Sequence, residues 1–361
     1  MHARTGFSGS YAADDVTFLL KRVALDPTDV RTKERAIQSG ARHYSEMIAP
    51  ESVPDEAYLS LYDAALARNG LRLAQDIASL AAHLADRAKG KDVVIASLAR
   101  AGTPIGVLLR RWLAANGVDA THYSISIIRD RGIDPQALAH IAGRHDPADL
   151  VFVDGWTGKG AIAGELRRSL AARQHGFAPT LVVVADPAGC ADIAATDEDY
   201  LIASGLLNGI VSGLVSRSIL SADTVGADDF HACITYPQHA AQDRSRAFVD
   251  ALTPLMLAAT PRLVADTTYR APAAAACEAL VADILAASAS TDRNRVKPGI
   301  AEATRALLRR VPERVYVRDP ADSDVAHLLH LATASGVPVD RLPADCRYRA
   351  VALIASLGQD G

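Results

Sequence analysis

The 361-residue sequence has only four cysteines, few aromatic residues and no long apolar run. The cysteines lie far apart and lack metal-ligand pairing, so neither a disulfide framework nor a zinc knuckle is indicated and reduced thiols are expected. No apolar segment approaches the roughly 18 residues that a membrane helix needs, and the polar start does not resemble a signal peptide. We therefore expect a cytoplasmic protein without a membrane partner.

The sequence also lacks a strong charge of one sign. Its formal net charge is −4 and the acidic and basic residues are interspersed, so the whole molecule is not a general binder of nucleic acid and any RNA site must be local. Apolar residues make up 49% of the chain but aromatics only 5%, with alanine dominant. This composition favours helices packed closely on a sheet, and the length exceeds that of one ordinary domain. The predicted class is α/β.

Short apolar runs alternate with helical stretches through the middle of the chain. The predicted strands are Val93–Ser97, Tyr123–Ile128, Leu150–Val153 and Leu181–Ala185. Strands separated by helices imply right-handed crossovers and a parallel, Rossmann-like sheet whose functional loops follow the carboxyl ends of the strands.

The regions on either side of these strands are less regular. Residues 1–70 are predicted to form a helical N-terminal segment, and an amphipathic helix is predicted over Leu71–Lys89. Segment 186–217 contains several glycines and is too long for a simple loop between two elements. We therefore expect it to belong to the functional site or to a subunit contact of a homo-oligomer. An alanine-rich helix is predicted over Ala271–Ser290.

A small α/β unit is predicted at the end of the chain. Its expected elements are a helix at Pro298–Arg310, a strand at Arg314–Val317, a helix at Ser323–Ser335, a strand at Val337–Val339 and a helix at Tyr348–Leu357. The resulting domain hypothesis is a main domain over residues 1–260, a helical linker over 261–293 and a small domain over 294–361.

The loop after the third predicted strand, Asp154 to Gly160, is the strongest functional signal. Three glycines let the backbone approach a ligand closely, and the N–H groups at the following helix start favour an anion. Asp154, at the strand end, is placed to accept hydrogen bonds from ribose hydroxyls. An ordinary Gly-rich turn is the alternative. The predicted phosphate-binding residues are Gly155, Thr157, Gly158, Lys159 and Gly160.

Four apolar residues, an acid and then Thr-Gly-Lys resemble the phosphoribosyl pyrophosphate (PRPP) motif of type I phosphoribosyltransferases, over roughly residues 91–195. The resemblance implies a phosphoribosyltransferase-like fold, PRPP as substrate and Mg²⁺ as cofactor. Two departures stand out: Gly155 replaces the usual second acid, and Gly160 replaces the closing threonine. A plain turn remains the alternative for the implied pyrophosphate loop. Its residues here are Ala101, Gly102 and Thr103.

The same resemblance implies a mobile hood over the reacting centre, at Arg129 to Asp134. A nucleophile would displace pyrophosphate from the ribose, with Asp154, Arg129 and Arg131 as the catalytic candidates and one of the two arginines neutralising the leaving group. A solvated hairpin tip is the alternative for this segment. Hood residues that could bind the acceptor base are Tyr44, Glu46 and Asp199.

More of the chain resembles one bacterial family. The strings that carry this resemblance are Ser8–Tyr11, His43–Met47, Ser97–Pro104, Tyr123–Asp134 and Val153–Ile162. Together they are similar to the family known as cysteine protease StiP, which is associated with tellurium-resistance and stress gene clusters. The resemblance implies a phosphoribosyltransferase-like main domain followed by a pelota-type RNA-binding domain. A thiol protease that uses Cys190, with His231 or His145 as its base, is the alternative function.

The C-terminal unit raises a third possibility, a non-catalytic protein that senses a nucleotide and binds structured RNA. Residues 294–318 hold seven Arg or Lys against two Glu. Pelota-type domains carry a Gly-x-Asn-Glu-x-x-Lys helix start, which this chain matches except that Ala301 replaces the Asn. A solvated basic helix face is the alternative. The predicted RNA-binding residues are Lys297, Gly299, Glu302 and Arg305.

Overall fold

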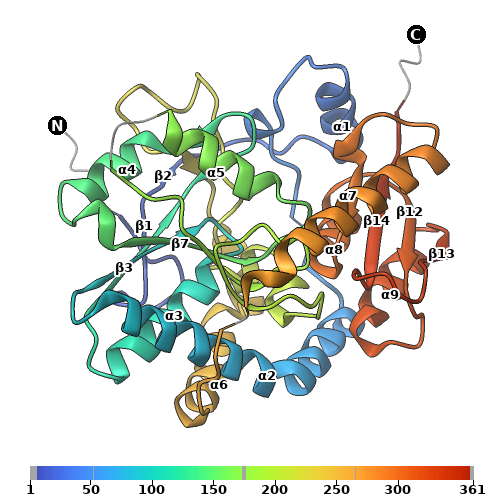
Figure 1. Cartoon of the computed structure of the whole chain (residues 1–361). Helices are drawn as coiled ribbons and strands as arrows, with labels where there is room; N and C mark the ends of the chain where they lie inside the picture. The colour runs from blue at the N-terminus through green and yellow to red at the C-terminus, as the bar shows by residue number, and fades with distance from the viewer. Residues whose placement is uncertain (1–5, 52, 173–175, 265, 358–361) are drawn as a thin grey trace.

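A parallel sheet forms the centre of the computed structural model, which describes residues 6–51, 53–172, 176–264 and 266–357 (Figure 1). Six strands in the order β1-β4-β3-β7-β8-β9 build it, all paired in parallel. They are β1 (Thr17–Phe18), β3 (Val93–Leu98), β4 (Ala120–Ile125), β7 (Leu150–Trp156), β8 (Leu181–Ala185) and β9 (Ile193–Thr196). The predicted α/β class is confirmed, and the four predicted strands correspond to β3, β4, β7 and β8.

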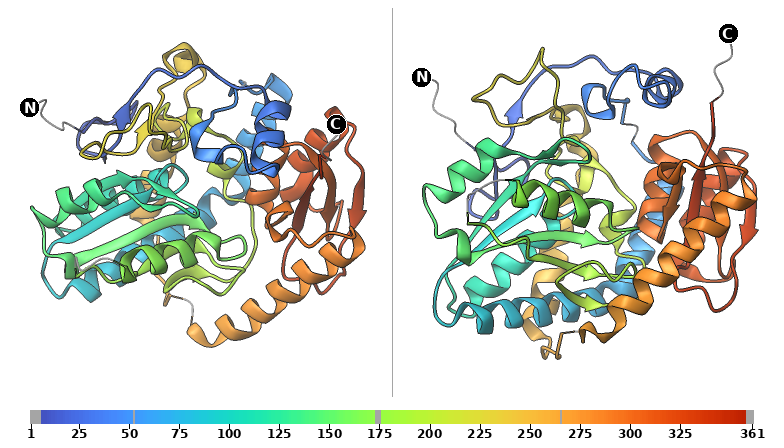
Figure 2. Two further views of the ribbon diagram at one scale, coloured as in Figure 1. Left: turned by 90° about the horizontal axis from the view of Figure 1, so that it is seen from above. Right: turned by 45° about the horizontal axis from the view of Figure 1, so that its top comes forward.

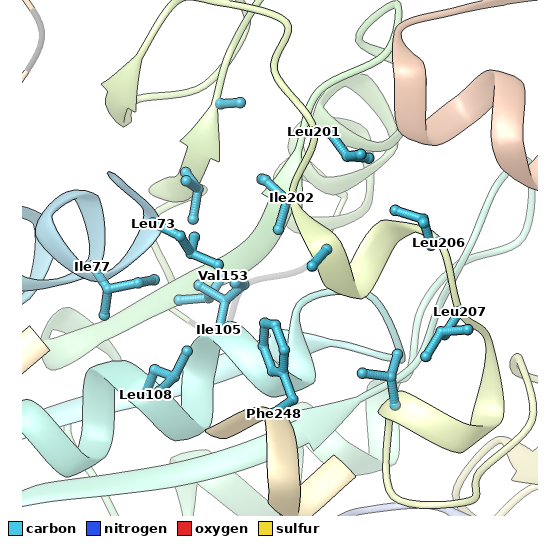
Figure 3. Packing of buried hydrophobic residues seen from close by; sticks show 14 of the residues in the cluster. Leu73, Ile77, Ile105, Leu108, Val153, Leu201, Ile202, Leu206, Leu207 and Phe248 are labelled. Carbon is cyan, nitrogen blue, oxygen red and sulfur yellow. The ribbon is translucent and has the colours of Figure 1, made fainter. Parts of the chain in front are cut away.

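Helices cover both faces of this sheet (Figure 1). One face carries α2 (Glu56–Ala88), α3 (Thr103–Ala115) and α6 (Ser245–Ala258), and the other carries α4 (Pro135–Ala142) and α5 (Ala161–Ala171). Along β7, Val151 and Val153 pack with α2 and α3, as Figure 3 shows for Val153, whereas Leu150 and Phe152 pack with α4 and α5. Burial of both faces explains why the strand reads as an unbroken apolar run.

The strand order creates a crevice at one edge of the sheet. From β3 the chain moves to β4 on one side, and it later returns to β7 on the other side of β3. The loops that follow β3 and β7 therefore diverge. Such a switch point, at the carboxyl ends of parallel strands, is where α/β sheets bind ligands.

A second sheet lies in the small C-terminal domain, with the order β11-β14-β12-β13. Its elements are β11 (Val296–Pro298), β12 (Pro312–Val317), β13 (Val339–Arg341) and β14 (Ala350–Ile354), with α8 (Ile300–Arg309) and α9 (Ala326–Ala334) on one face and α7 (Arg270–Ala287) on the other. The helix predicted over Tyr348–Leu357 is wrong, because β14 is a central strand buried on both sides. The alanine-rich helix is confirmed as α7, which packs on this sheet although it was expected in a linker.

The N-terminal segment is less helical than predicted. It holds β1, β2 (Lys21–Arg22), which pairs with β10 (Ala232–Cys233), then α1 (Val30–Gln38) and a 3₁₀ turn at Tyr44–Glu46, before α2 begins at Glu56. Helix α1 lies beside the C-terminal domain in both views of Figure 2, where Arg310 donates to Glu34 at 2.7 Å. Among the described residues, no helix combines the length and apolarity that crossing a membrane requires.

Candidate functional site

Three adjoining cavities lie between the carboxyl edge of the parallel sheet and the C-terminal domain. The inner cavity, about 280 Å³, follows β3 and is lined by Ala99, Arg100 and Ala101 together with α1 and α8. The loop cavity, about 220 Å³, follows β7 and is lined by residues 156–163 and by β11. The vestibule, about 390 Å³, lies between α1, residues 129–131 and residues 292–295. Together they form the cleft.

Asp154 lies between the inner and loop cavities and lines both of them. One of its carboxylate oxygens accepts from the backbone N–H of Gly155 at 2.8 Å. Burial raises the pKa of Asp154 to about 7, against the opposing effect of the Arg305 guanidinium. Asp154 is thus at the centre of the cleft, but β7 continues to Trp156, so Asp154 lies within the strand and not at its end as predicted; Gly155 lines neither cavity.

The loop after β7 lines the loop cavity and contains bare amides, that is, backbone N–H groups without a hydrogen-bond acceptor in the described chain. Gly160 has φ of +80°, a left-handed conformation that favours glycine, and helix α5 begins at the next residue. Among the described residues, the backbone N–H groups of 158–163 have no hydrogen-bond acceptor. Because these amides start a helix, they and its dipole favour an anion.

Two side chains of this loop are engaged elsewhere. The Thr157 hydroxyl donates to the Asp186 carboxylate at 2.6 Å. The Lys159 ammonium donates to the backbone carbonyl oxygens of Arg293 and Val296, the latter at 3.0 Å, so it ties the loop to the C-terminal domain. Lys159 also lines the loop cavity, so its predicted role as a cation beside phosphate oxygens stays a prediction.

The implied pyrophosphate loop is only partly exposed to the cleft. Ala101 lines the inner cavity. A Cβ on Gly102 would lie 2.2 Å from the carbonyl oxygen of Val153, so glycine is required there for close packing on β7. The Thr103 hydroxyl is buried and lies 2.8 Å from that of Ser124. Gly102 and Thr103 therefore support the loop from behind.

Among the cations that line the inner cavity are Lys33, Arg217, Lys297 and Arg309, of which the sequence pattern singled out only Lys297. Lys33 is only 4% exposed, and its ammonium donates to the backbone carbonyl oxygen of Arg309 at 3.3 Å. Lys297 and the Arg309 guanidinium have no hydrogen-bond or ion-pair partner among the described residues, and the Nε of Arg309 is fully buried. Arg217 donates to the carbonyl oxygens of Tyr44, at 2.6 Å, and Met47. None of these four cations has a carboxylate partner in the described chain.

The charged forms of these groups are destabilised. Burial, followed by repulsion from neighbouring cations, lowers the pKa of Lys33 and of Lys297 to about 7 and the pKa of Arg217 to about 10. The same causes depress the pKa of Arg309. The buried Ser218 hydroxyl, also on the cavity wall, has no hydrogen-bond partner in the described residues. An anion in this cavity would relieve all of these penalties.

The predicted hood borders the outer part of the cleft. Residues 129–131 form the turn between β5 (Ile127–Ile128) and β6 (Gly132–Ile133). Arg129 lies over the Tyr44 ring, 5.5 Å from its centroid, and donates to the Asn294 side chain at 3.0 Å. Arg131 pairs with Glu46 at 3.0 Å and lines only the vestibule. Tyr44 lines all three cavities, as a hood residue should.

The predicted RNA-binding residues face the parallel sheet. Arg305 lies over the Trp156 ring, 4.5 Å from its centroid, and Glu302 accepts from Arg305 at 3.0 Å and from the Trp156 indole at 3.3 Å. Lys297 lies beside them on the cavity wall. Gly299 has φ of +97° and precedes α8, whose first amide donates to Asp199 at 3.1 Å. Asp199 therefore caps α8 and does not belong to the hood.

Cys190, the predicted protease nucleophile, lies on the wall of the loop cavity. Burial and then the nearby Asp186 raise its pKa to about 12, which keeps the thiol protonated. Of the predicted bases, His145 contacts the Tyr123 hydroxyl at 3.0 Å and His231 contacts the Ser126 hydroxyl at 2.7 Å. No cysteine in the described residues is hydrogen bonded to a histidine.

Few carboxylates line the inner parts of the cleft. Asp154 and Glu302 are the carboxylates of the inner and loop cavities, and Glu302 is held by Arg305 and Trp156. Nowhere in the described parts of the chain do three or more His, Cys, Asp or Glu side chains gather so that they could hold a metal ion. These side chains alone therefore form no complete ligand set, and the expected Mg²⁺, which proteins usually hold through one or two carboxylates together with substrate phosphates, stays a prediction.

Comparisons with known proteins identify relatives of the chain. Residues 9–253 match the family model described as tellurite-like stress resistance cysteine protease StiP. Residues 275–356 match the model of the PELOTA RNA binding domain. A protein of Acinetobacter baylyi named cysteine protease StiP is 44% identical over 99% of this chain and 96% of its own length.

Solved structures also show partial likenesses. The hypoxanthine phosphoribosyltransferase of Trypanosoma cruzi aligns with a TM-score of 0.29 and 16% identity, over 36% of this chain and 80% of that chain. A phosphoribosyltransferase from Leishmania tarentolae in complex with GMP aligns with a TM-score of 0.26 and 13% identity, over 52% and 96% of the two chains.

Proposed function

The chain belongs to the StiP family, and from the geometry of its cleft we propose that it binds PRPP and transfers the phosphoribosyl group to an acceptor base or nucleoside-like molecule. One observation carries the proposal: Asp154 lies between two cavities that are each suited to an anion. The loop cavity offers bare amides and the inner cavity offers cations without carboxylate partners. PRPP has the matching form, with a phosphate at one end of a ribose and a diphosphate at the other.

We assign each group of PRPP to one part of the cleft. The 5-phosphate accepts from the amides that start α5, and the ribose hydroxyls donate to Asp154. The diphosphate lies near Ala101, among Lys33, Arg217 and Arg309. The lowered pKa values of Lys33 and Lys297 return toward the ordinary value when a polyanion lies beside them, and the ribose hydroxyls supply the buried Asp154 carboxylate with hydrogen bonds.

The transfer step follows from this placement. The bond from the anomeric carbon to the pyrophosphate oxygen breaks, the acceptor nitrogen bonds to that carbon, and the proton of the acceptor passes to water. Charge develops on the leaving pyrophosphate, so the cations of the inner cavity stabilise the transition state more than the ground state.

Calorimetry with PRPP, in buffer with Mg²⁺ and in buffer with a chelator, tests this proposal. Binding is expected in the wild-type protein and in Arg341→Gln, a control at an exposed arginine of β13. Binding should be at least about tenfold weaker in Asp154→Ala, which removes the ribose acceptor. The absence of heat in both buffers, or an unchanged affinity in Asp154→Ala, would refute the proposal.

A thiol protease is the second candidate, supported by the name of the Acinetobacter relative and by the position of Cys190 on the cleft wall. The high pKa of Cys190 and its lack of a histidine partner in the described residues count against it. Labelling by a thiol-directed inhibitor, with Cys190→Ser as the control, decides the matter. Peptide hydrolysis that disappears in Cys190→Ser and persists in Asp154→Ala would favour the protease.

RNA binding by the C-terminal domain is a further proposal, supported by its match to an RNA-binding domain model. The residues predicted for it, Lys297, Glu302 and Arg305, lie within the cleft and not on an open face. The domain boundaries, the homo-oligomer, the cytoplasmic location and the tellurium context stay predictions.

A further inference from the structure

The basic segment of the C-terminal domain divides into two sets. In the first set the guanidinium groups are paired with carboxylates: Arg295 pairs with Glu313 at 2.5 Å, and Arg314 pairs with Asp340 at 2.5 Å. On the cleft side, Lys297 has no partner in the described residues. Because a matched arginine attracts phosphate weakly, Lys297 and Arg309 are the cations of this segment that the cleft offers to a phosphate.

The size of the cleft limits which RNA could reach that charge. The inner and loop cavities, about 280 and 220 Å³, are each somewhat smaller than the roughly 300 Å³ at which the range of small-ligand sites begins. They have room for a nucleotide and none for a double helix. Any RNA that reaches Lys297 and Arg309 in this arrangement enters as a single-stranded end.

A 5′-monophosphorylated RNA end and PRPP share one chemical group, a ribose 5-phosphate. We propose that the cleft binds the 5′-phosphorylated end of single-stranded RNA, with the terminal phosphate on the amides that start α5 and the terminal ribose beside Asp154. This inference rests on the proposed function, because both ligands use the same phosphate cradle. It follows that PRPP and the RNA end exclude each other.

The rest of the RNA has a path out of the cleft. The vestibule adjoins the loop cavity and shares Tyr44, Arg129 and Arg310 with it. Arg129 and Arg217 lie over the ring of Tyr44, so the first base stacks on this ring only by displacing one of the two guanidinium groups. Beyond it, Arg42 and Arg131 line the vestibule, each within reach of Glu46. The next phosphates of the strand would compete with that carboxylate for the two guanidinium groups.

Fluorescence anisotropy with the full-length protein tests this inference. The probes are one short single-stranded RNA labelled at its 3′ end, carrying either a 5′-phosphate or a 5′-hydroxyl, and a labelled circular RNA of the same sequence. The 5′-phosphate form is expected to bind about tenfold or more tightly than the other two, since it alone adds charge-assisted hydrogen bonds. PRPP should displace it. Arg42→Gln should weaken RNA binding. Arg341→Gln removes the same charge at an exposed site outside the cleft and should leave RNA binding unchanged.

The outcomes separate this inference from the proposed function. If PRPP gives calorimetric heat but circular RNA binds as tightly as the 5′-phosphorylated end, or PRPP does not displace that end, the shared site is refuted and the PRPP site stands. The same holds if no RNA binds. If RNA binds while PRPP gives no heat, the PRPP proposal fails and the shared cradle fails with it.

Discussion

Two groups of arginine and lysine side chains border the cleft, and they differ in how their charges are matched. In the vestibule, Arg131 pairs with Glu46 and Arg310 pairs with Glu34. Around the inner cavity, Lys33, Lys297 and Arg309 have no carboxylate partner in the described residues, and their pKa values are depressed. These two vestibule arginines are therefore neutralised by carboxylates of the protein. The unmatched cations of the inner cavity would gain a counter-charge from a bound anion.

Matched cations also line the inner cavity, and one of them, Arg100, allows a test inside the same region. Arg100, 6% exposed, donates to both carboxylate oxygens of Glu51 at 3.2 and 2.9 Å. Although burial opposes it, Arg100 holds the pKa of Glu51 below its ordinary value. The protein therefore satisfies a buried arginine where its role is structural, and the remaining unmatched cations are the ones available to a ligand.

The largest expected effect comes from breaking that buried pair. Glu51→Gln leaves Arg100 without its counter-charge, and removal of one partner of a buried pair typically costs about 3 kcal/mol. We expect a loss of this size in the free energy of unfolding, measured by urea denaturation with an unchanged slope. A loss below about 1 kcal/mol would show that solvent or another group already compensates Arg100.

The unmatched cations should behave in the opposite way. In Arg309→Met, PRPP affinity is expected to fall by about tenfold or more, because a charge-assisted contact is lost. Stability of the free protein should not fall, since the variant removes a cation that its neighbours repel. Calorimetry and urea denaturation measure the two effects on the same sample. A variant that loses stability and keeps its affinity would assign Arg309 a structural role instead.

A third prediction concerns protons. With pKa values of about 7, Lys33 and Lys297 are roughly 90% neutral in the free protein at pH 8, and a bound polyanion raises these values again. PRPP binding at pH 8 should therefore take up protons, which calorimetry detects as a heat that depends on the ionisation enthalpy of the buffer. Uptake should be smaller in Lys297→Met. Equal heats in all buffers would contradict the depressed pKa values.

The same two lysines also make the free energy of unfolding depend on pH, and their depressed pKa values fix the direction of that dependence. Their folded pKa values lie below the ordinary value of 10.5, so the unfolded chain binds more protons between about pH 7 and 10. The contribution of these lysines to the free energy of unfolding therefore rises with pH across that window. Other groups titrate there too, so the measurement is the difference in slope between wild type and Lys297→Met.

The comparison also shows what the sequence could and could not reveal. The loop at Asp154 was predictable, because an apolar run, a strand-terminal acid and clustered glycines are local signals. The inner cations were not predictable, because Lys33, Arg217 and Arg309 come from three distant segments and only the tertiary fold brings them together. Their neighbours in sequence give no signal of a shared cavity.

The same limit explains the errors in the C-terminal domain. The short apolar run Ala350–Ile354 fits a buried strand or a helix equally well by periodicity, and its pairing with β11 and β12 decided the outcome. The basic composition of residues 294–318 was visible, but which charges were already matched was not. Glu34, which neutralises Arg310, lies in α1 at the other end of the chain.

The smallest expected effect belongs to the vestibule. Arg131 and Glu46 are 43% and 24% exposed, and pairs this accessible contribute less than about 1 kcal/mol. Arg131→Gln should therefore change both the free energy of unfolding and the PRPP affinity less than Glu51→Gln and Arg309→Met change them. If Arg131→Gln weakens PRPP binding as much as Arg309→Met, the hood arginine contacts the ligand directly, as the catalytic hypothesis for Arg131 requires. In that case the vestibule and the inner cavity act as a single anion site, and the distinction between matched and unmatched cations does not decide where the ligand binds.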